Sequence, residues 1–173
     1  MVLVLRRAAL FVAFVLIWAM LAAVAAHSAT RDIVGFSGFA PGTIVVKTEQ
    51  RRLYYVIDER HALRFPVGVG RAGKEWTGQA RIDGKYVRPA WSPPAEIRRD
   101  HPGLPEVIPG GDVKNPMGVA ALTMRGGEYA IHGTNNPASI GGFVSYGCIR
   151  MYNSDIRELY KRVDIGTPVI VER

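Results

Sequence analysis

The sequence contains a single cysteine, Cys148, in the glycine-rich stretch IHGTNNPASIGGFVSYGCIRM, which also holds His132. A thiol becomes a strong nucleophile when a nearby base takes its proton, and imidazole is the side chain that most often serves as that base. The pair therefore predicts covalent catalysis, with Cys148 as the nucleophile and His132 as the general base. The alternative interpretation is an inert thiol beside a structural histidine, since an isolated cysteine usually behaves as a small apolar residue.

Backbone N–H groups around the thiol could stabilise the charge that develops on a carbonyl oxygen during attack. Gly147 precedes Cys148, and a glycine beside a nucleophile lets a substrate approach the backbone closely. The N–H groups of Tyr146, Gly147 and Cys148 are therefore predicted to form an oxyanion hole.

Two further groups are expected to tune the catalytic pair. Arg150 follows Cys148 at the spacing that would place both side chains on one face of a strand, and a fixed positive charge favours the thiolate. Arg150 could also bind a substrate carboxylate or form a structural ion pair with Asp155. The backbone carbonyl of Gly133 is the predicted acceptor that orients His132, because the stretch contains no acidic residue.

The same residues resemble the signature of the YkuD-type L,D-transpeptidases, which are bacterial cell-wall enzymes. The resemblance runs from about Thr43 to the C-terminus, with one departure at Tyr146, where many members of the family carry histidine. The matching residues are His132-Gly133-Thr134-Asn135, Ser145-x-Gly147-Cys148-Ile149-Arg150-Met151-x-Asn153-x-Asp155, Trp91-Ser92-Pro93-Pro94 and Asn115-Pro116-x-Gly118.

The resemblance implies an acyl transfer on a peptidoglycan stem tetrapeptide, in which Cys148 forms a thioester and the terminal D-alanine leaves. The acceptor stays open: a second stem peptide would give a cross-link, water a carboxypeptidase, and a lysine of a wall-anchored protein an attachment reaction. The resemblance also makes Ser145 a second candidate for orienting His132. It places Thr134, Asn135 and Trp91 on the substrate side. No cofactor is implied, and the four histidines have no zinc-ligand spacing, so no metal site is predicted.

Two other functions are compatible with the sequence. One is a different exported cysteine peptidase that acts on ordinary L-peptides. The other is a wall-binding module with an inactive site, which Tyr146 makes conceivable.

The N-terminus predicts export. Arg6 and Arg7 precede an uninterrupted apolar run over 8–26, and small residues follow as far as Ala29. This order is typical of a secretory signal peptide, although the run is also just long enough to span a bilayer as an anchor. Residues 1–29 are therefore predicted to be a signal peptide or a membrane anchor, and the only membrane contact. The rest is expected in the periplasm or on the cell-wall side of the cytoplasmic membrane, where an unpaired cysteine favours a catalytic role.

Composition indicates a folded domain without a nucleic-acid partner. Apolar residues make up 48% of the chain and charged residues 21%, which is ordinary for a globular protein. The net charge is +7, but the Lys and Arg residues are scattered and not interleaved with aromatic residues.

The expected elements describe one mainly β domain. Glycine and proline residues predict a linker over 30–42, followed by a single catalytic domain over 43–173. Asp83-Gly84 predicts a hairpin turn, and the proline-rich segment over 89–116 predicts a long loop, which is usually functional. Asn153 or Ser154 is expected to cap a helix that runs to about Val163. Together these predict a β-sandwich or barrel-like fold with one or two short helices, and strands over 43–49, 52–58, 62–69, 79–82, 85–87, 117–124, 128–132 and 168–171.

Overall fold

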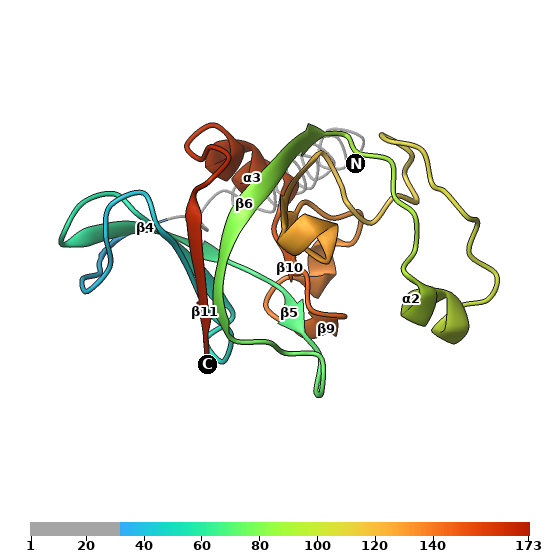
Figure 1. Cartoon of the computed structure of the whole chain (residues 1–173), viewed down its shortest axis with the longest axis horizontal. Helices are drawn as coiled ribbons and strands as arrows, with labels where there is room; N and C mark the ends of the chain where they lie inside the picture. The colour runs from blue at the N-terminus through green and yellow to red at the C-terminus, as the bar shows by residue number, and fades with distance from the viewer. Residues whose placement is uncertain (1–31) are drawn as a thin grey trace, which may run out of the picture. The chain divides into compact units, whose positions relative to one another are not determined.

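The computed structural model describes residues 32–173, and the predicted signal peptide or anchor lies outside them. A nine-stranded sheet forms the body of the protein in the order β1-β4-β3-β2-β11-β6-β7-β8-β10, and a second sheet pairs β5 with β9. In Figure 1, the paired strands β11 and β6 lie side by side. The architecture confirms the predicted mainly β fold. The strands are β1 (Asp32–Gly35), β2 (Ile44–Lys47), β3 (Arg52–Val56), β4 (His61–Pro66), β5 (Val69–Gly70), β6 (Gly78–Val87), β7 (Ala120–Met124), β8 (Tyr129–His132), β9 (Phe143–Ser145), β10 (Ile149–Arg150) and β11 (Pro168–Glu172).

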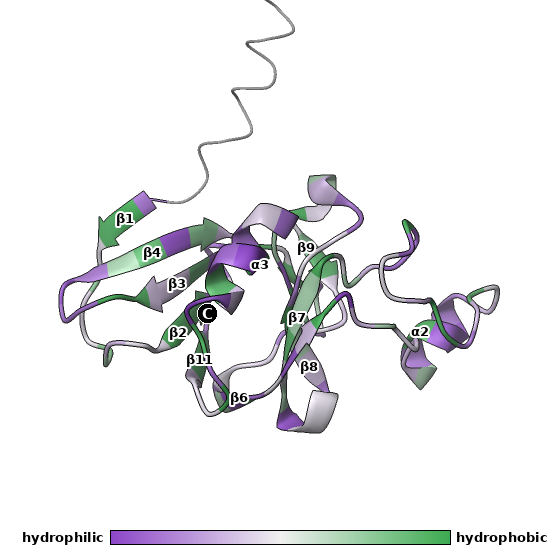
Figure 2. Ribbon diagram, turned by 90° about the horizontal axis from the view of Figure 1, so that it is seen from above, coloured by the Kyte–Doolittle hydropathy of each residue, from purple (hydrophilic) through white to green (hydrophobic). Residues whose placement is uncertain are grey.

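Strand β6 joins the two halves of the large sheet. Its first part pairs with β11 and its second part with β7, and the register shifts between Ile82 and Gly84. Asp83-Gly84 is therefore a bulge inside one strand, and the predicted hairpin turn was wrong. The bulge is stable because the Asp83 carboxylate accepts hydrogen bonds from the Thr123 hydroxyl and the Gly126 N–H, both at 2.5 Å. Figure 2 shows β2, β3, β4 and β11 on one side of this strand and β7 and β8 on the other.

Helix α3 (Asn153–Tyr160) packs on the main hydrophobic core with Ile156 and Leu159, both fully buried. The core also receives Ile131 from β8 and Ile149 from β10. Burying an aliphatic side chain of this size contributes about 1.5–3 kcal/mol, so the inward face of these two strands is strongly determined. The other α-helix described, α2 (Ala95–Asp100), is short, and two 3-10 helices, η1 (Arg125–Gly127) and η2 (Pro137–Ser139), lie in connecting segments. Within residues 32–173, no helix combines the length and apolarity needed to cross a bilayer.

The segment over 30–42, predicted to be a linker, contains strand β1 and two packed phenylalanines. β1 pairs with β4 in antiparallel register. The Phe36 ring stacks on Tyr54 with 4.3 Å between centroids and on Phe39 with 5.3 Å. These rings pack against a second, smaller core cluster on β2, β3 and β4. The glycine and proline content of this stretch conceals its two aromatic residues, which hold it against the sheet.

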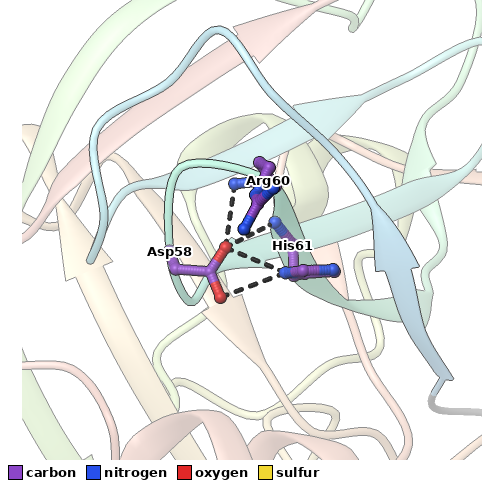
Figure 3. A network of polar contacts seen from close by, with 3 residues as sticks. All are labelled: Asp58, Arg60 and His61. Carbon is purple, nitrogen blue, oxygen red and sulfur yellow. Dashed lines mark hydrogen bonds and ion pairs between the residues drawn. The ribbon is translucent and has the colours of Figure 1, made fainter.

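The tip of the β3–β4 hairpin is organised by Asp58 (Figure 3). Its Oδ1 accepts the N–H groups of Arg60 at 2.8 Å and His61 at 2.9 Å, and Nδ1 of the His61 ring lies 3.0 Å from the same oxygen. These hydrogen bonds lower the pKa of Asp58, and the one from the Arg60 N–H has the largest effect. The side chain of His61 therefore helps to stabilise this turn.

The proline-rich loop over 89–116 carries α2 and is closed by one buried side chain, Asn115. Its Nδ2 donates to the carbonyls of Pro89 at 2.9 Å and Pro109 at 3.0 Å, and its Oδ1 accepts the N–H of Met117 at 2.9 Å. A long loop without regular structure needs such internal hydrogen bonds to satisfy its backbone groups. The loop is therefore an ordered arm that begins and ends close to the sheet (Figure 1).

Candidate active site

Strands β8 and β10 bring the cysteine and the histidine to one face of the sheet. The strands pair in parallel, with Ile149 opposite Ile131. The next pair is Arg150 opposite His132. Both isoleucines point into the core and side chains alternate along a strand, so Arg150 and His132 project from the other face. Cys148 lies just before β10, and the same alternation predicts its side chain on this face as well.

His132 is buried, with an exposed fraction of 4%, and is neutral at pH 7. Burial and the positive charge of Arg150 lower its pKa to about 4, while the carbonyls of Gly133 and Pro116 act in the opposite direction. The Gly133 carbonyl lies 2.7 Å from Nδ1 and accepts a hydrogen bond from it. This contact assigns the N–H to Nδ1 and the lone pair to Nε2. In this tautomer Nε2 carries the lone pair that a general base needs, and the role of His132 as that base stays a prediction.

Cys148 is half-buried, and its thiol is protonated at neutral pH. Burial raises the pKa of the thiol, whereas a hydrogen bond from the Ala130 backbone and the positive charge of Arg150 act to lower it. The resting pair is therefore a neutral thiol and a neutral imidazole. Such a thiol needs a base that takes its proton as the sulfur attacks.

The turn that precedes Cys148 is held by Ser145. The Ser145 hydroxyl donates to the Cys148 carbonyl at 2.6 Å and accepts the Gly147 N–H at 3.1 Å. The hydroxyl is thus occupied within the turn, while the His132 ring donates to the carbonyl of Gly133. The Gly147 N–H is therefore not free to serve the predicted oxyanion hole, for which the N–H groups of Tyr146 and Cys148 stay predicted donors.

Gly147 is the residue that this turn requires. Its φ of +118° is unfavourable for any residue with a side chain, and a Cβ would lie 2.6 Å from the Tyr129 ring. Its carbonyl accepts a hydrogen bond from the indole N–H of Trp76 at 3.0 Å. Trp76 lies in the loop between β5 and β6, and sequence analysis did not single it out.

The positive charge of Arg150 acts to lower the pKa of both predicted catalytic groups, Cys148 and His132. Burial lowers the pKa of Arg150 itself, and its Nε is buried without a hydrogen-bond partner among the described residues. An unsatisfied buried donor costs free energy until a ligand pairs with it. The two roles predicted for Arg150, a ligand for a substrate carboxylate and a structural ion pair with Asp155, both stay predictions.

The sequence is similar to those of a known family of proteins. Residues 41–171 match the YkuD family, described as the L,D-transpeptidase catalytic domain. The chain belongs to this family. The resemblance predicted from the sequence is thereby confirmed.

Two relatives from Escherichia coli K12 support the assignment. The chain is 40% identical over 135 residues to Probable L,D-transpeptidase ErfK/SrfK, covering 73% of this chain and 42% of that protein. It is 38% identical over 136 residues to Probable L,D-transpeptidase YbiS, covering 74% and 43% respectively. The chain therefore spans less than half the length of these relatives.

A solved structure shares the fold at low sequence identity. The catalytic domain of the Enterococcus faecium L,D-transpeptidase acylated by ertapenem matches with a TM-score of 0.58 and 21% identity, covering 79% of this chain and all of that one (100%).

In this member of the L,D-transpeptidase catalytic domain family, Tyr146 belongs to a polar cluster with the end of α2. Its hydroxyl donates to the Asp100 carboxylate, which Arg71 also pairs at 3.0 Å. The Arg71 guanidinium lies 3.9 Å from the centroid of the Tyr146 ring. The hydrogen bond to Asp100 raises the pKa of Tyr146. The phenol therefore stays protonated at neutral pH and cannot act as a base.

We expect Tyr146→Phe to keep the rate of Cys148 acylation within about tenfold of wild type, a barrier change of about 1.4 kcal/mol. The reason is that the hydroxyl holds α2 through Asp100, while the backbone N–H of residue 146 is unchanged. Asp100→Asn is the matched control, because it weakens the same contact from its other end. Stopped-flow acylation of both variants checks this, and a hundredfold loss in Tyr146→Phe alone would show that the hydroxyl takes part in the chemistry.

The three residues predicted on the substrate side differ in availability. Thr134 is buried, and its hydroxyl accepts the Asn136 N–H at 3.0 Å, so its side chain stabilises a turn. Asn135 is exposed and lines a surface cavity. Trp91 is half-buried at the base of the 89–116 loop, where its backbone pairs with Ile108 through two hydrogen bonds. Substrate contact by Asn135 and Trp91 stays a prediction.

Asn153 has a role that the sequence did not indicate, although it lies in the matched motif. Its Oδ1 accepts the N–H of Thr134 at 3.1 Å, and its Nδ2 donates to the carbonyl of the same residue at 2.9 Å. It thereby clamps the chain just after His132 and Gly133. A Cβ at residue 133 would lie 2.2 Å from this Oδ1, so the contact requires glycine there. The helix is preceded by Tyr152 and has no side-chain cap, so the predicted capping role was wrong.

Proposed function

We propose that the chain is an exported peptidoglycan L,D-transpeptidase that forms a thioester on Cys148. The observation that carries the proposal is the parallel pairing of β8 with β10. This pairing sets Arg150 opposite a buried, neutral His132, and Cys148 is two residues before Arg150 in the sequence, which supports the proposed pair of thiol and imidazole. The basic and apolar N-terminal sequence supports export.

Acylation begins when Nε2 of His132 takes the Cys148 proton and the sulfur attacks the carbonyl carbon before the terminal D-alanine. The N–H groups of Cys148 and Tyr146 stabilise the oxyanion. When the intermediate collapses, the C–N bond breaks, His132 returns the proton to the leaving amine, and D-alanine departs. Arg150 binds the carboxylate of that D-alanine before it leaves.

Deacylation follows the reverse sequence with a new nucleophile. The side-chain amine of a second stem peptide attacks the thioester carbonyl, and His132 takes a proton from the amine. The C–S bond breaks, and the Cys148 thiolate regains its proton from His132. Water in place of the amine would make the enzyme an L,D-carboxypeptidase, and a lysine of a wall-anchored protein would give protein attachment.

Intact-mass spectrometry with a muropeptide that carries a tetrapeptide stem tests the proposal. The expected results are a covalent acyl adduct on Cys148, free D-alanine, and a cross-linked product when a second stem is supplied. Release of D-alanine without cross-linking would indicate a carboxypeptidase. Turnover of casein but not of the muropeptide would indicate an ordinary cysteine peptidase, and binding without an adduct or product would indicate a wall-binding module.

We expect a carbapenem to acylate Cys148 stably, because attack on its strained lactam uses the same thiol and the same oxyanion hole. The Enterococcus faecium domain of this fold is acylated by ertapenem. Incubation with ertapenem followed by peptide mapping should place the adduct on the peptide that contains Cys148, and Cys148→Ala should remain unmodified. An adduct on a serine, or none with several carbapenems, would contradict the site.

A further inference from the structure

We infer that Trp76 is a positioning residue for the oxyanion hole, acting through the carbonyl of Gly147, and this inference rests on the proposed thioester chemistry. The indole Nε1–H donates to that carbonyl at 3.0 Å. Gly147 is buried and Trp76 is half-buried, so the contact is partly shielded from water. Trp76 acts on the backbone of the turn that carries the nucleophile.

The geometry of the peptide bond transmits this contact to Cys148. The Gly147 carbonyl and the Cys148 N–H belong to one planar trans peptide and point in opposite directions. When Trp76 holds the carbonyl on its own side, the Cys148 N–H must point away from Trp76. The N–H has no acceptor among the described residues, and it is the donor next to the attacking sulfur.

The glycine makes such a hold necessary. Gly147 reaches backbone angles closed to other residues, so the peptide that follows it can rotate at low cost. Rotation of the Gly147–Cys148 peptide would turn the carbonyl, instead of the N–H, toward the substrate oxygen. A fixed hydrogen-bond donor for this carbonyl prevents the rotation.

The other backbone groups of the turn have their own partners. The Ser145 carbonyl accepts the Arg71 N–H at 2.9 Å, the Gly147 N–H donates to the Ser145 hydroxyl, and the Cys148 carbonyl accepts from the same hydroxyl. These contacts hold the peptides on either side of the Gly147–Cys148 peptide. Trp76 supplies the hydrogen bond to the carbonyl of that central peptide.

Trp76 is itself held in place by aromatic and cationic neighbours. Its ring stacks on Tyr129 with 4.9 Å between centroids and an angle of 22°. The Arg125 guanidinium lies 5.0 Å from the centroid of the indole on which it packs. Tyr129 begins the strand that ends with His132, so the donor is attached to the element that carries the base.

Two reactions of the same sulfur separate this role from a structural one. Acylation by ertapenem develops an oxyanion, whereas alkylation by iodoacetamide displaces iodide at a saturated carbon and develops none. Trp76→Phe keeps an aromatic ring for stacking but lacks the N–H. We expect its acylation rate to fall at least tenfold, and its alkylation rate to stay within about twofold of wild type from pH 6 to pH 9.

Tyr55→Phe is the matched control, because it removes an aromatic donor to another backbone carbonyl, that of Arg162, in a different part of the sheet. Both of its rates should equal those of wild type. A second variant replaces Trp76 with benzothienylalanine, in which sulfur substitutes for the indole N–H at nearly constant shape. It should reproduce the selective loss of acylation even if Trp76→Phe folds poorly.

Two outcomes would overturn this inference without contradicting the proposed function. One is a benzothienylalanine variant that acylates at the wild-type rate. The other is a parallel loss of acylation and alkylation in that variant, which would show a general disturbance of the thiol. If wild type itself forms no acyl adduct while iodoacetamide still modifies Cys148, the proposed function fails, and the inference fails with it.

Discussion

Cys148→Ala is expected to abolish thioester formation and all turnover while leaving the fold nearly intact. No other residue of the sequence carries a thiol, so no second sulfur can replace it. The side chain is half-buried and small, and its loss should reduce the free energy of unfolding by at most about 1–2 kcal/mol. The variant should therefore fold and bind the stem peptide without reacting with it.

The measurement combines activity with stability. Release of D-alanine from a tetrapeptide stem and the ertapenem adduct should both disappear, while urea unfolding should show a closely similar midpoint. Wild-type protein alkylated with iodoacetamide is the control, because it loses the same nucleophile without a change in sequence. Residual turnover above a few per cent in Cys148→Ala would refute the assignment of the nucleophile.

The sequence could predict the chemistry of the site because the reactive side chains are rare and lie in one motif. It could not predict which backbone donors remain free. The N–H of Gly147 belongs to the expected set, but Ser145 occupies it. A short-range pattern does not show such competition, since it depends on how the turn closes on itself.

Contacts across the chain are the part of the site that sequence analysis missed. Trp76 reaches Gly147 from a separate loop, and Asn153 reaches back to Thr134 from the start of a helix. Neither residue type by itself indicates a positioning role, because a Trp usually contributes to packing and an Asn to helix capping. Both roles become visible only once the strands are paired.

The sequence could predict the class of the fold but not the details of strand pairing, for a related physical reason. Local propensity identifies short strands, but it does not separate a tight turn from a bulge, since Asp and Gly suit both. At Asp83 the outcome is decided by Thr123 and Gly126, which lie on and after a different strand. Strand partners therefore override local preference there.

His132→Ala is expected to lower the acylation rate at pH 7 by about 10²–10⁴, the usual contribution of a general base. The effect should fall on the rate of acylation more than on substrate binding, because the base acts as the thiol proton is removed. Stopped-flow acylation by ertapenem over a range of concentrations separates the two quantities. A variant that acylates at nearly the wild-type rate at neutral pH would show that His132 is not the base.

The pH dependence makes this prediction more specific. Because the pKa of His132 is lowered to about 4, wild-type acylation should rise with pH around 4 and reach a plateau below neutral pH. In His132→Ala this acid limb should vanish, and the rate should follow the thiolate, increasing about tenfold per pH unit below the raised pKa of Cys148. A wild-type acid limb centred on the ordinary histidine value of 6.5 would contradict the neutral, buried imidazole.

The same lowered pKa predicts a pH-dependent stability that provides an independent check. Unfolded His132 binds a proton below its ordinary pKa of 6.5, whereas the folded imidazole binds one only near pH 4. The stabilisation is therefore complete above pH 6.5 and is lost as the pH falls toward 4. It amounts to about 3 kcal/mol, since one pKa unit corresponds to about 1.4 kcal/mol. Urea unfolding between pH 4 and pH 7 should show this loss in wild type and a shallower one in His132→Ala, and equal slopes would contradict the buried neutral state.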